Sequence, residues 1–450
     1  MSEHLTKDAI DLSTLSIPRL FGRYFLPTLL GMISISAMCA IDGIFVGHAV
    51  GADGIGAINI CVPIMMLATG LGLMMGAGCS VVASIHMAEK KLKAARINVM
   101  QAWIFTSIVI LAMIIPVMLF PSATGRLLGS SEALLPLVRE YMLGFMPGEL
   151  FGVWCALLLF VIRLDGNPRL AMWCNVIAAV ANIVLDWLMI VHLGWGLAGA
   201  AVASTLSMMI GGLIAAWYIL FAARQLRPIR LKWSRRSLLY SMRNIGYQCT
   251  IGISALMGEG TMAVLTLVGN YVFITYMGDP GVGAFGIACY YTPFVYMIGN
   301  AVAQSAQPII SYNYGIGNGH RVRSTLKVAL LTAVLCGGAV SAAFVLFPYQ
   351  LTELFVSTTE AAFPIAVKGL PLMAVAFVFF IVNLMCIGYF QSVERVRPAM
   401  MFALLRGAVF LVPSFILLPK VLGDSGIWLA LALSELLTTA CIMAYAALWR

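Results

Sequence analysis

Charged residues are scarce in this chain. Only 10% of its 450 residues are Asp, Glu, Lys or Arg, whereas 62% are hydrophobic and the mean hydropathy is +0.98. Soluble proteins carry about 25% charged residues, and a chain with so few has too little polar surface to cover a globule in water. The composition therefore excludes a soluble protein and predicts an integral membrane protein.

Residue patterns that carry enzyme or metal chemistry are missing as well. The five histidines lie in the terminus, in loops or near helix ends, and the ten cysteines are scattered without a close pair. This distribution excludes a histidine relay at the membrane centre and argues against disulfide or metal roles for the cysteines. No HExxH motif or Ser with His constellation occurs within the apolar segments. We expect neither enzymatic activity nor a cofactor.

Apolar stretches long enough to span a bilayer recur along the whole chain. A transmembrane helix needs about 20 predominantly apolar residues, and the stretches leave no room for a soluble domain between them. The predicted fold class is an all-α integral membrane protein with twelve transmembrane helices, at 22–46, 55–84, 97–120, 136–162, 168–191, 197–222, 244–275, 283–312, 324–347, 366–392, 399–419 and 426–448.

Basic residues are concentrated on one side of this twelve-helix arrangement. They fill alternate connections, such as 90–96, 224–243 and 321–327, whereas the opposite side has only Arg126, Arg139, Lys368 and Lys420. By the positive-inside rule, both termini and the 224–243 segment are cytoplasmic. We interpret the net charge of +9 as a topology signal and a contact with anionic lipid, not as a nucleic-acid site. The start of the chain lacks the form of a cleaved signal peptide.

The chain also repeats itself. A shift of 227 residues places Gly51, Gly54, Gly56 and Ala57 on Gly278, Gly281, Gly283 and Ala284. A shift of 230 places Gly196 and Ser204 on Gly426 and Ser434. We predict two pseudo-symmetric six-helix bundles, 1–223 and 244–450, joined by a basic cytoplasmic linker at 224–243. Because each chain contains both halves of a parallel-repeat transporter, we expect a monomer.

Two acidic residues stand alone in apolar runs of the first half. Asp42 lies in the run 38–46 and Asp186 in the run 182–190, and nothing else in either run is charged. A carboxylate in such a place costs about 2 to 4 kcal/mol on insertion scales, and it usually persists because an ion, a proton or a substrate uses it. The pair indicates a cation-coupled machine. The alternative is a structural acid that locks two helices together.

Several strings in both halves carry a resemblance to a known family. They are Pro27, the string DGIFVG at 42–47, RLDGNPRLAM at 163–172, Asn182 with Asp186, GLAGAAVAS at 196–204, and QPIISYNYG at 307–315. Each string alone is weak, but their order and spacing span nearly the whole chain. The chain resembles the multidrug and toxic compound extrusion (MATE) family of transporters, and is most similar to its bacterial DinF and MepA-like branch.

This resemblance implies a fold, an activity and a site. The expected fold is a V-shaped pair of bundles that rock around a central cavity and exchange an organic substrate for protons or sodium ions. In similar family members the amino-terminal bundle holds the cation site, whose residues match Asp42, Tyr141, Asn182, Asp186 and Ser204 here. Ser204 departs from the family, which often has threonine, but its hydroxyl oxygen is retained.

The chemistry of these residues leaves two coupling ions open. Asn182 and Asp186 are four residues apart and share one helix face, so a carboxylate, an amide oxygen and the Ser204 hydroxyl suit a hard cation such as sodium. Alternatively, a carboxyl group among apolar neighbours takes up and releases a proton near neutral pH. For Tyr141 and Ser204 the alternative is a hydroxyl that only packs helices together. Pro27 removes a backbone donor well inside its helix and predicts a hinge or a static kink.

The second half has its own candidates for contact with substrate. Glu259 lies between Gly258 and Gly260, where small neighbours leave room for a ligand, and Glu435 lies in the last helix. A further set surrounds Pro293 and consists of Tyr290, Tyr291 and Tyr296. The alternatives are acids satisfied by neighbouring hydroxyls or by Arg406, and tyrosines that pack or lie at the membrane interface. The same alternative applies to Glu149.

The hypothesis that these features favour is a secondary active antiporter in a bacterial inner membrane. It would export amphipathic, cationic organic compounds in exchange for protons or sodium ions, with the lipid bilayer and a small organic substrate as its partners. The alternative is a flippase for lipid-linked precursors from the same superfamily. A flippase for anionic headgroups should line its cavity with arginines, but only Arg406 lies within the helices of the second half.

Overall fold

The computed structural model describes residue 12 and residues 15–229 and 235–448. Within these ranges every regular element is helical. Of the predicted linker, residues 230–234 lie outside the described part, as do Lys7 and its neighbours at the start of the chain. Twelve helices are long and apolar enough to cross a membrane, so the predicted number of spans is confirmed. Most of them are longer than predicted; the first runs over Ile17–Ala49.

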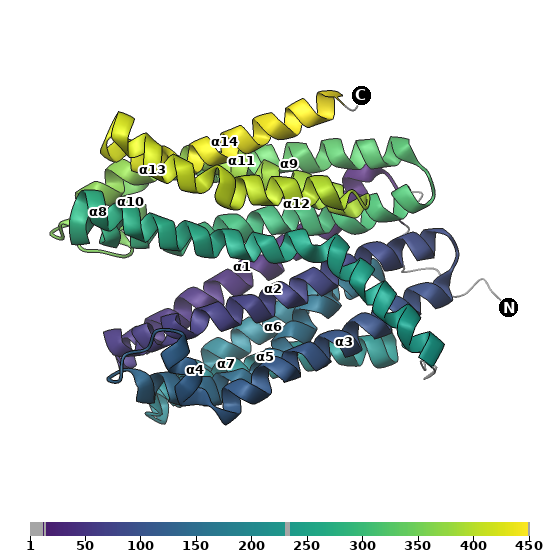
Figure 1. The fold of residues 1–450 in the computed structure, drawn as a ribbon, viewed down its shortest axis with the longest axis horizontal. Helices are drawn as coiled ribbons and strands as arrows, with labels where there is room; N and C mark the ends of the chain where they lie inside the picture. Colours follow the sequence, from purple (N-terminus) through teal and green to yellow (C-terminus); the bar gives the residue numbers. More distant parts are fainter. Residues whose placement is uncertain (1–11, 13–14, 230–234, 449–450) are drawn as a thin grey trace. The chain divides into compact units, whose positions relative to one another are not determined.

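The first half of the chain forms six spans (Figure 1). Its elements are α1 (Ile17–Ala49), α2 (Ala52–Ala88), α3 (Leu92–Leu119), α4 (Pro121–Leu127), α5 (Leu135–Leu164), α6 (Pro168–Asp186), the π-helical segment η1 (Trp187–His192), α7 (Gly196–Trp217) and the π-helical segment η2 (Tyr218–Ala222).

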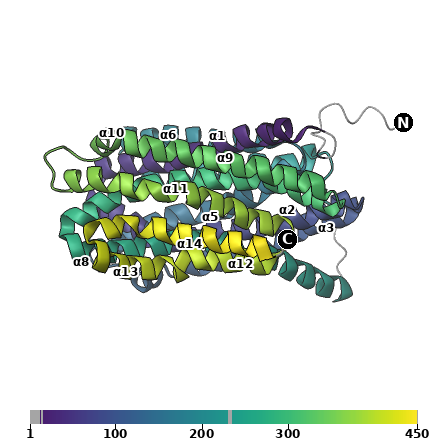
Figure 2. The same ribbon diagram turned by 90° about the horizontal axis from the view of Figure 1, so that it is seen from above.

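The second half forms six more spans, and Figure 2 shows α9, α11, α12 and α14 running lengthwise. Its elements are α8 (Arg235–Gly315), α9 (Gly319–Leu346), α10 (Pro348–Glu353), α11 (Ala362–Ser392), α12 (Val396–Leu404), the π-helical segment η3 (Leu405–Val409), α13 (Leu411–Leu422) and α14 (Asp424–Leu448). The long α8 breaks at Gly278, where φ is 65°, so it supplies two spans, Leu239–Gly278 and Pro280–Gly315.

The internal repeat is visible in the backbone. Gly51 and Gly278, which the 227-residue shift aligns, both adopt positive φ, at 79° and 65°, with ψ near the same value. Glycine adopts this conformation without the steric cost that a Cβ brings. The short helices α4 and α10 begin at Pro121 and Pro348, which the same shift aligns, and each follows the third span of its half. The sequence analysis did not predict these two short helices.

Contacts divide the chain into two compact units at a place other than the predicted linker. One unit holds the described residues up to Leu256 together with Ser311–Gly319, and the other holds Met257–Ile310 and the residues from His320 onward. The first turns of α8 therefore pack with the first unit. Gln248 Nε2 donates to Asn98 Oδ1 at 2.8 Å, and the backbones of α2 and α8 approach closely where Gly78 meets Gln248.

Small residues bring the helices of the first unit close together. A Cβ on Gly148 would lie 2.7 Å from Thr205 Cα, and one on Gly212 would lie 2.4 Å from the carbonyl oxygen of Phe151, so α5 and α7 touch along their backbones. Thr205 Oγ1 donates to the carbonyl of Gly144 at 2.7 Å. Close approach over small residues and hydroxyl groups is the usual way in which membrane helices associate. This packing fixes the position of α5 against α7.

Asp165 binds the start of the segment that joins the two halves. It follows α5, and its carboxylate accepts hydrogen bonds from the Tyr218 hydroxyl and from the backbone N–H groups of Arg224, Gln225 and Leu226, at 2.8 to 3.0 Å. A buried carboxylate that accepts several N–H and O–H donors is well stabilised. The first residues of the predicted linker are therefore held against the first unit.

Candidate functional site

The two isolated aspartates of the first half face each other. Asp42 lies in α1 and Asp186 is the last residue of α6. The two helices pack closely because Gly31 of α1 has no side chain, and a Cβ there would lie 3.3 Å from Met172 Cα of α6. The carboxyl groups are near enough to interact directly. The side chain of Asp186 is completely buried.

These acids have oxygen atoms that accept nothing. In the described part of the chain, no N–H or O–H group donates to Asp42 Oδ1, to either carboxyl oxygen of Asp186, or to Asn182 Oδ1. Buried polar atoms are normally hydrogen-bonded, and a buried charge without a partner costs several kcal/mol. Two carboxylates in contact also repel each other. A proton or a metal cation bound between them would remove both costs.

Asn182 and Ser204 complete one side of this group. Asn182 lies one helical turn before Asp186, and its Nδ2 donates to Ser204 Oγ of α7 at 3.4 Å. This bond turns Asn182 Oδ1, which has no donor, away from the serine. Both side chains are buried, with 1% and 8% of their surface exposed. The pair thus provides an amide oxygen and a hydroxyl oxygen beside the two carboxylates.

Tyr141 of α5 lies on the other side. It is buried, stacks on Phe145 with 5.3 Å between ring centroids, and lies within electrostatic range of Asp42. The close packing of α5 on α7 holds it there. The structure therefore brings the predicted Asp42, Tyr141, Asn182, Asp186 and Ser204 together within one unit, from α1, α5, α6 and α7. Their roles in cation binding stay predictions.

The backbone changes its winding next to Asp186. The π-helical segment η1 follows this residue directly. A π turn holds one more residue than an α turn, and such turns are often found at functional sites. Asp186 therefore lies at the junction between two helical registers, where the side chain is aimed independently of the rest of its span.

Pro27 lies inside a continuous helix. α1 runs without interruption from Ile17 to Ala49, and Pro27 is partly buried. Tyr24 and Thr28, which flank it, are buried, and among the described residues neither hydroxyl has a hydrogen-bond partner. The kink-forming residue is thus surrounded by polar groups that no bond fixes. The role of Pro27 as a hinge stays a prediction.

The acids of the second unit differ in their partners. Glu259 of α8 accepts a hydrogen bond from the Tyr296 hydroxyl at 3.1 Å and is 9% exposed. Glu435 of α14 is fully buried and accepts from Arg406 Nε at 3.0 Å and Nη2 at 2.7 Å, while Asn383 Nδ2 donates to its other oxygen at 2.7 Å. Both oxygens of Glu435 are therefore occupied, and its contacts are those of the structural alternative, an acid satisfied by Arg406.

The three tyrosines predicted to line one cavity do not lie together. Tyr296 is buried against Glu259. Tyr290 is half exposed and stacks on Phe355, and the Tyr291 hydroxyl donates to the carbonyl of Leu351 at 2.9 Å. The expectation of a single tyrosine-lined wall is wrong, because Tyr290 and Tyr291 pack on the segment after α9 and only Tyr296 reaches an acid.

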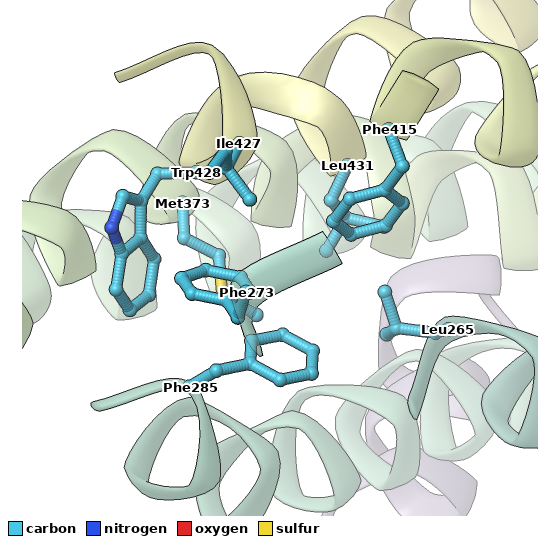
Figure 3. A pocket seen from close by; sticks show the side chains of 8 residues that line it. All are labelled: Leu265, Phe273, Phe285, Met373, Phe415, Ile427, Trp428 and Leu431. Carbon is cyan, nitrogen blue, oxygen red and sulfur yellow. The ribbon is translucent and has the colours of Figure 1, made fainter. Parts of the chain in front are cut away.

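A small pocket in the second unit is apolar (Figure 3). It is lined by Leu265, Phe273, Phe285, Met373, Phe415, Ile427, Trp428 and Leu431. Phe273 stacks on Phe285 with 4.5 Å between ring centroids and meets Trp428 edge to face. None of the predicted substrate-contacting residues borders this pocket, and its lining is that of a packed aromatic core.

Twelve apolar helices in two repeated halves define a multi-pass membrane protein of the transporter class. Comparison with known families agrees with the repeat, because the MatE family model matches the chain twice, at residues 27–188 and at residues 255–416. These matches cover more than half of the chain, and the protein belongs to the MatE family.

Similar proteins are exporters and transporters. The chain is 22% identical to the multidrug export protein MepA of Staphylococcus haemolyticus over 93% of its length and 91% of the relative's. It is 23% identical to an FAD transporter of Shewanella oneidensis over 72% and 71% of the two chains. Two solved structures share the fold. A multidrug resistance MATE transporter in an outward-facing conformation superposes with a TM-score of 0.90 at 22% identity over 99% and 98% of the chains. A MOP superfamily transporter from Pyrococcus furiosus superposes with a TM-score of 0.89 at 21% identity, over the same shares.

Proposed function

We propose that the protein is a secondary antiporter that exports amphipathic, cationic organic compounds in exchange for protons or sodium ions. The observation that carries this proposal is the buried pair Asp42 and Asp186, whose oxygens lack donors although the pair lies within a membrane-spanning bundle. Acids placed in this way mark ion and proton pathways in membrane proteins. The MepA relatives, which are named as multidrug exporters, support the export of organic compounds.

Binding of the cation would change the balance between two conformations. Without it, two buried carboxylates repel each other across the contact of α1 and α6, whereas a cation between them draws the two helices together. Coupling requires only that the cation bind the two conformations with different affinity. In this proposal the protein works as a monomer in the plasma membrane of a bacterium, with both termini and the 224–243 segment in the cytoplasm.

A flippase for anionic lipid precursors is the weaker alternative. Arg406 is the only arginine within the spans of the second half, and its guanidinium is engaged with Glu435 and lies 4.2 Å above the ring of Phe380. An anionic headgroup would have to displace Glu435 from this pair. The free acids of the first unit instead favour a cation.

The test is a flux assay in proteoliposomes with proton and sodium gradients imposed separately. We expect one gradient to drive efflux of an organic cation, and Asp186→Asn to abolish it while purified protein still folds. Asp53→Asn is the matched control, because Asp53 is an exposed aspartate of the same unit at the start of α2. Efflux at the wild-type rate in both Asp42→Asn and Asp186→Asn would refute the assignment of the site.

A further inference from the structure

One buried acid has no partner at all. Glu149 lies in the middle of α5, inside the span Leu135–Leu164, and is 4% exposed. The other deeply buried acids are bound: Glu435 to Arg406, Glu259 to Tyr296, and Asp165 to four donors. Within the described part of the chain, neither a hydrogen bond nor an ion pair reaches Glu149.

Glu149 shares a helix face with Tyr141. The residues Tyr141, Phe145 and Glu149 follow one another at intervals of four, which places them in one row along α5. Tyr141 is within electrostatic range of both Asp42 and Glu149. The tyrosine therefore lies between the aspartate pair of the cation site and this third acid.

No basic group faces this row in the described structure. The titratable groups that interact with Tyr141 are Asp42 and Cys39 of α1, Cys61 of α2, and Glu149 itself. The other helices packed on α5 bring no charge to Glu149: α3 contributes the Ser107 hydroxyl beside Trp154, and α7 contributes Thr205, which is bound to backbone carbonyls. A negative charge on Glu149 thus has no compensation.

This isolation selects the ligand. An ionised carboxylate without a partner in an apolar medium is so costly that the group takes up a proton instead. Sodium would need several oxygen ligands, as other hard cations do. Glu149 brings a single carboxyl group, and no grouping of three acidic, histidine or cysteine side chains occurs among the described residues. A proton satisfies the site with one atom.

We propose that Glu149 is a second proton-carrying site of the first unit, linked through Tyr141 to the Asp42 and Asp186 pair. Negative charge on one side of the tyrosine disfavours negative charge on the other, because both lie in a low dielectric. Loading of Glu149 therefore favours the ionised state of Asp42, and release favours its reprotonation. The proposal rests on the antiport function only for its consequence in transport, which is one additional proton per cycle.

The decisive experiment measures the proton directly, on purified protein without substrate or gradient. Infrared spectra at neutral pH should contain a carbonyl band from a protonated carboxylic acid that disappears in Glu149→Gln. Glu140→Gln is the matched control, because it makes the same change at an exposed position of the same helix. The band should remain in Glu140→Gln and shift in Tyr141→Phe. A spectrum in which Glu149→Gln retains every such band overturns the proposal.

Transport measures the consequence separately. In proteoliposomes under a fixed pH gradient, Glu149→Gln should lower the steady-state substrate gradient by about tenfold per pH unit, because each coupled proton contributes one factor of ten. If no gradient drives efflux in the wild type, the antiport proposal fails, but the infrared result still decides the state of Glu149. If Glu149→Gln does not fold, Glu149→Asp takes its place. It should keep the acid band at a shifted frequency, and an unshifted band would count against the proposal.

Discussion

The buried pair Arg406 and Glu435 allows a quantitative prediction about stability. Both side chains are almost completely buried, at 1% and 0% exposed, and two hydrogen bonds of 3.0 and 2.7 Å join them. Removing one partner of such a pair leaves a buried charge uncompensated and costs about 3 to 5 kcal/mol. Replacing both partners by apolar side chains of similar volume costs little or nothing, because no charge remains to be desolvated.

The prediction is therefore non-additive. Glu435→Gln and Arg406→Met should each lower the free energy of unfolding by about 3 to 5 kcal/mol, and the double variant Arg406→Met with Glu435→Leu should be more stable than either. Asn383 does not lose all its partners in the double variant, because its Nδ2 also donates to the Glu435 backbone carbonyl at 2.8 Å and its Oδ1 accepts from Thr439 at 2.9 Å.

Equilibrium unfolding in mixed micelles measures these differences. The matched control is Glu132→Gln, since Glu132 also pairs with an arginine, Arg126, at 2.8 Å, but both side chains are more than half exposed. Exposed pairs contribute little, so this variant should unfold like the wild type. The reasoning is refuted if Glu435→Gln behaves like Glu132→Gln, or if the double variant is destabilised by the sum of the two single changes.

Three further outcomes are expected. Glu259→Gln should weaken the binding of organic cations, but not of neutral analogues, in a binding titration, since only the charge changes; equal losses would indicate a structural acid. A cysteine introduced at Arg227 should resist a membrane-impermeant thiol reagent in intact cells, and labelling from outside would contradict the cytoplasmic placement of the linker. Asp165→Asn loses one charge and accepts fewer hydrogen bonds, so limited proteolysis should cut the segment after Tyr218 faster, and an unchanged rate would show that other contacts hold it.

The fold followed from the sequence because its main signals are strong. Scarce charge and long apolar stretches predicted twelve spans, and the aligned glycines predicted a repeat that reappears as two positive φ angles, at Gly51 and Gly278. The short helices α4 and α10 escaped prediction because they are too short to produce a hydropathy signal. The acids Asp42 and Asp186 stood out because each is the only charge in its apolar run.

The partners of the second-half residues were beyond the reach of the sequence. Successive residues of a helix are rotated by about 100°, so proximity in sequence could not show that Tyr290 and Tyr296 point to different surroundings. Arg406 and Glu435 belong to different helices, and only tertiary packing decides which acid the arginine meets. The isolation of Glu149 is likewise a property of its neighbours, and its own local sequence does not reveal it.

The π-helical segments have a consequence for insertions and deletions. Each lies at a polar or charged group: η1 follows Asp186, η2 begins at Tyr218, which binds Asp165, and η3 contains Arg406. A π turn is an α-helix with one residue added. Deleting one residue within η1 would restore regular winding and rotate the following part of the span by about 100° relative to Asp186. These three places should therefore tolerate changes in side chain better than changes in length, whereas the connection at 224–243 should show the reverse.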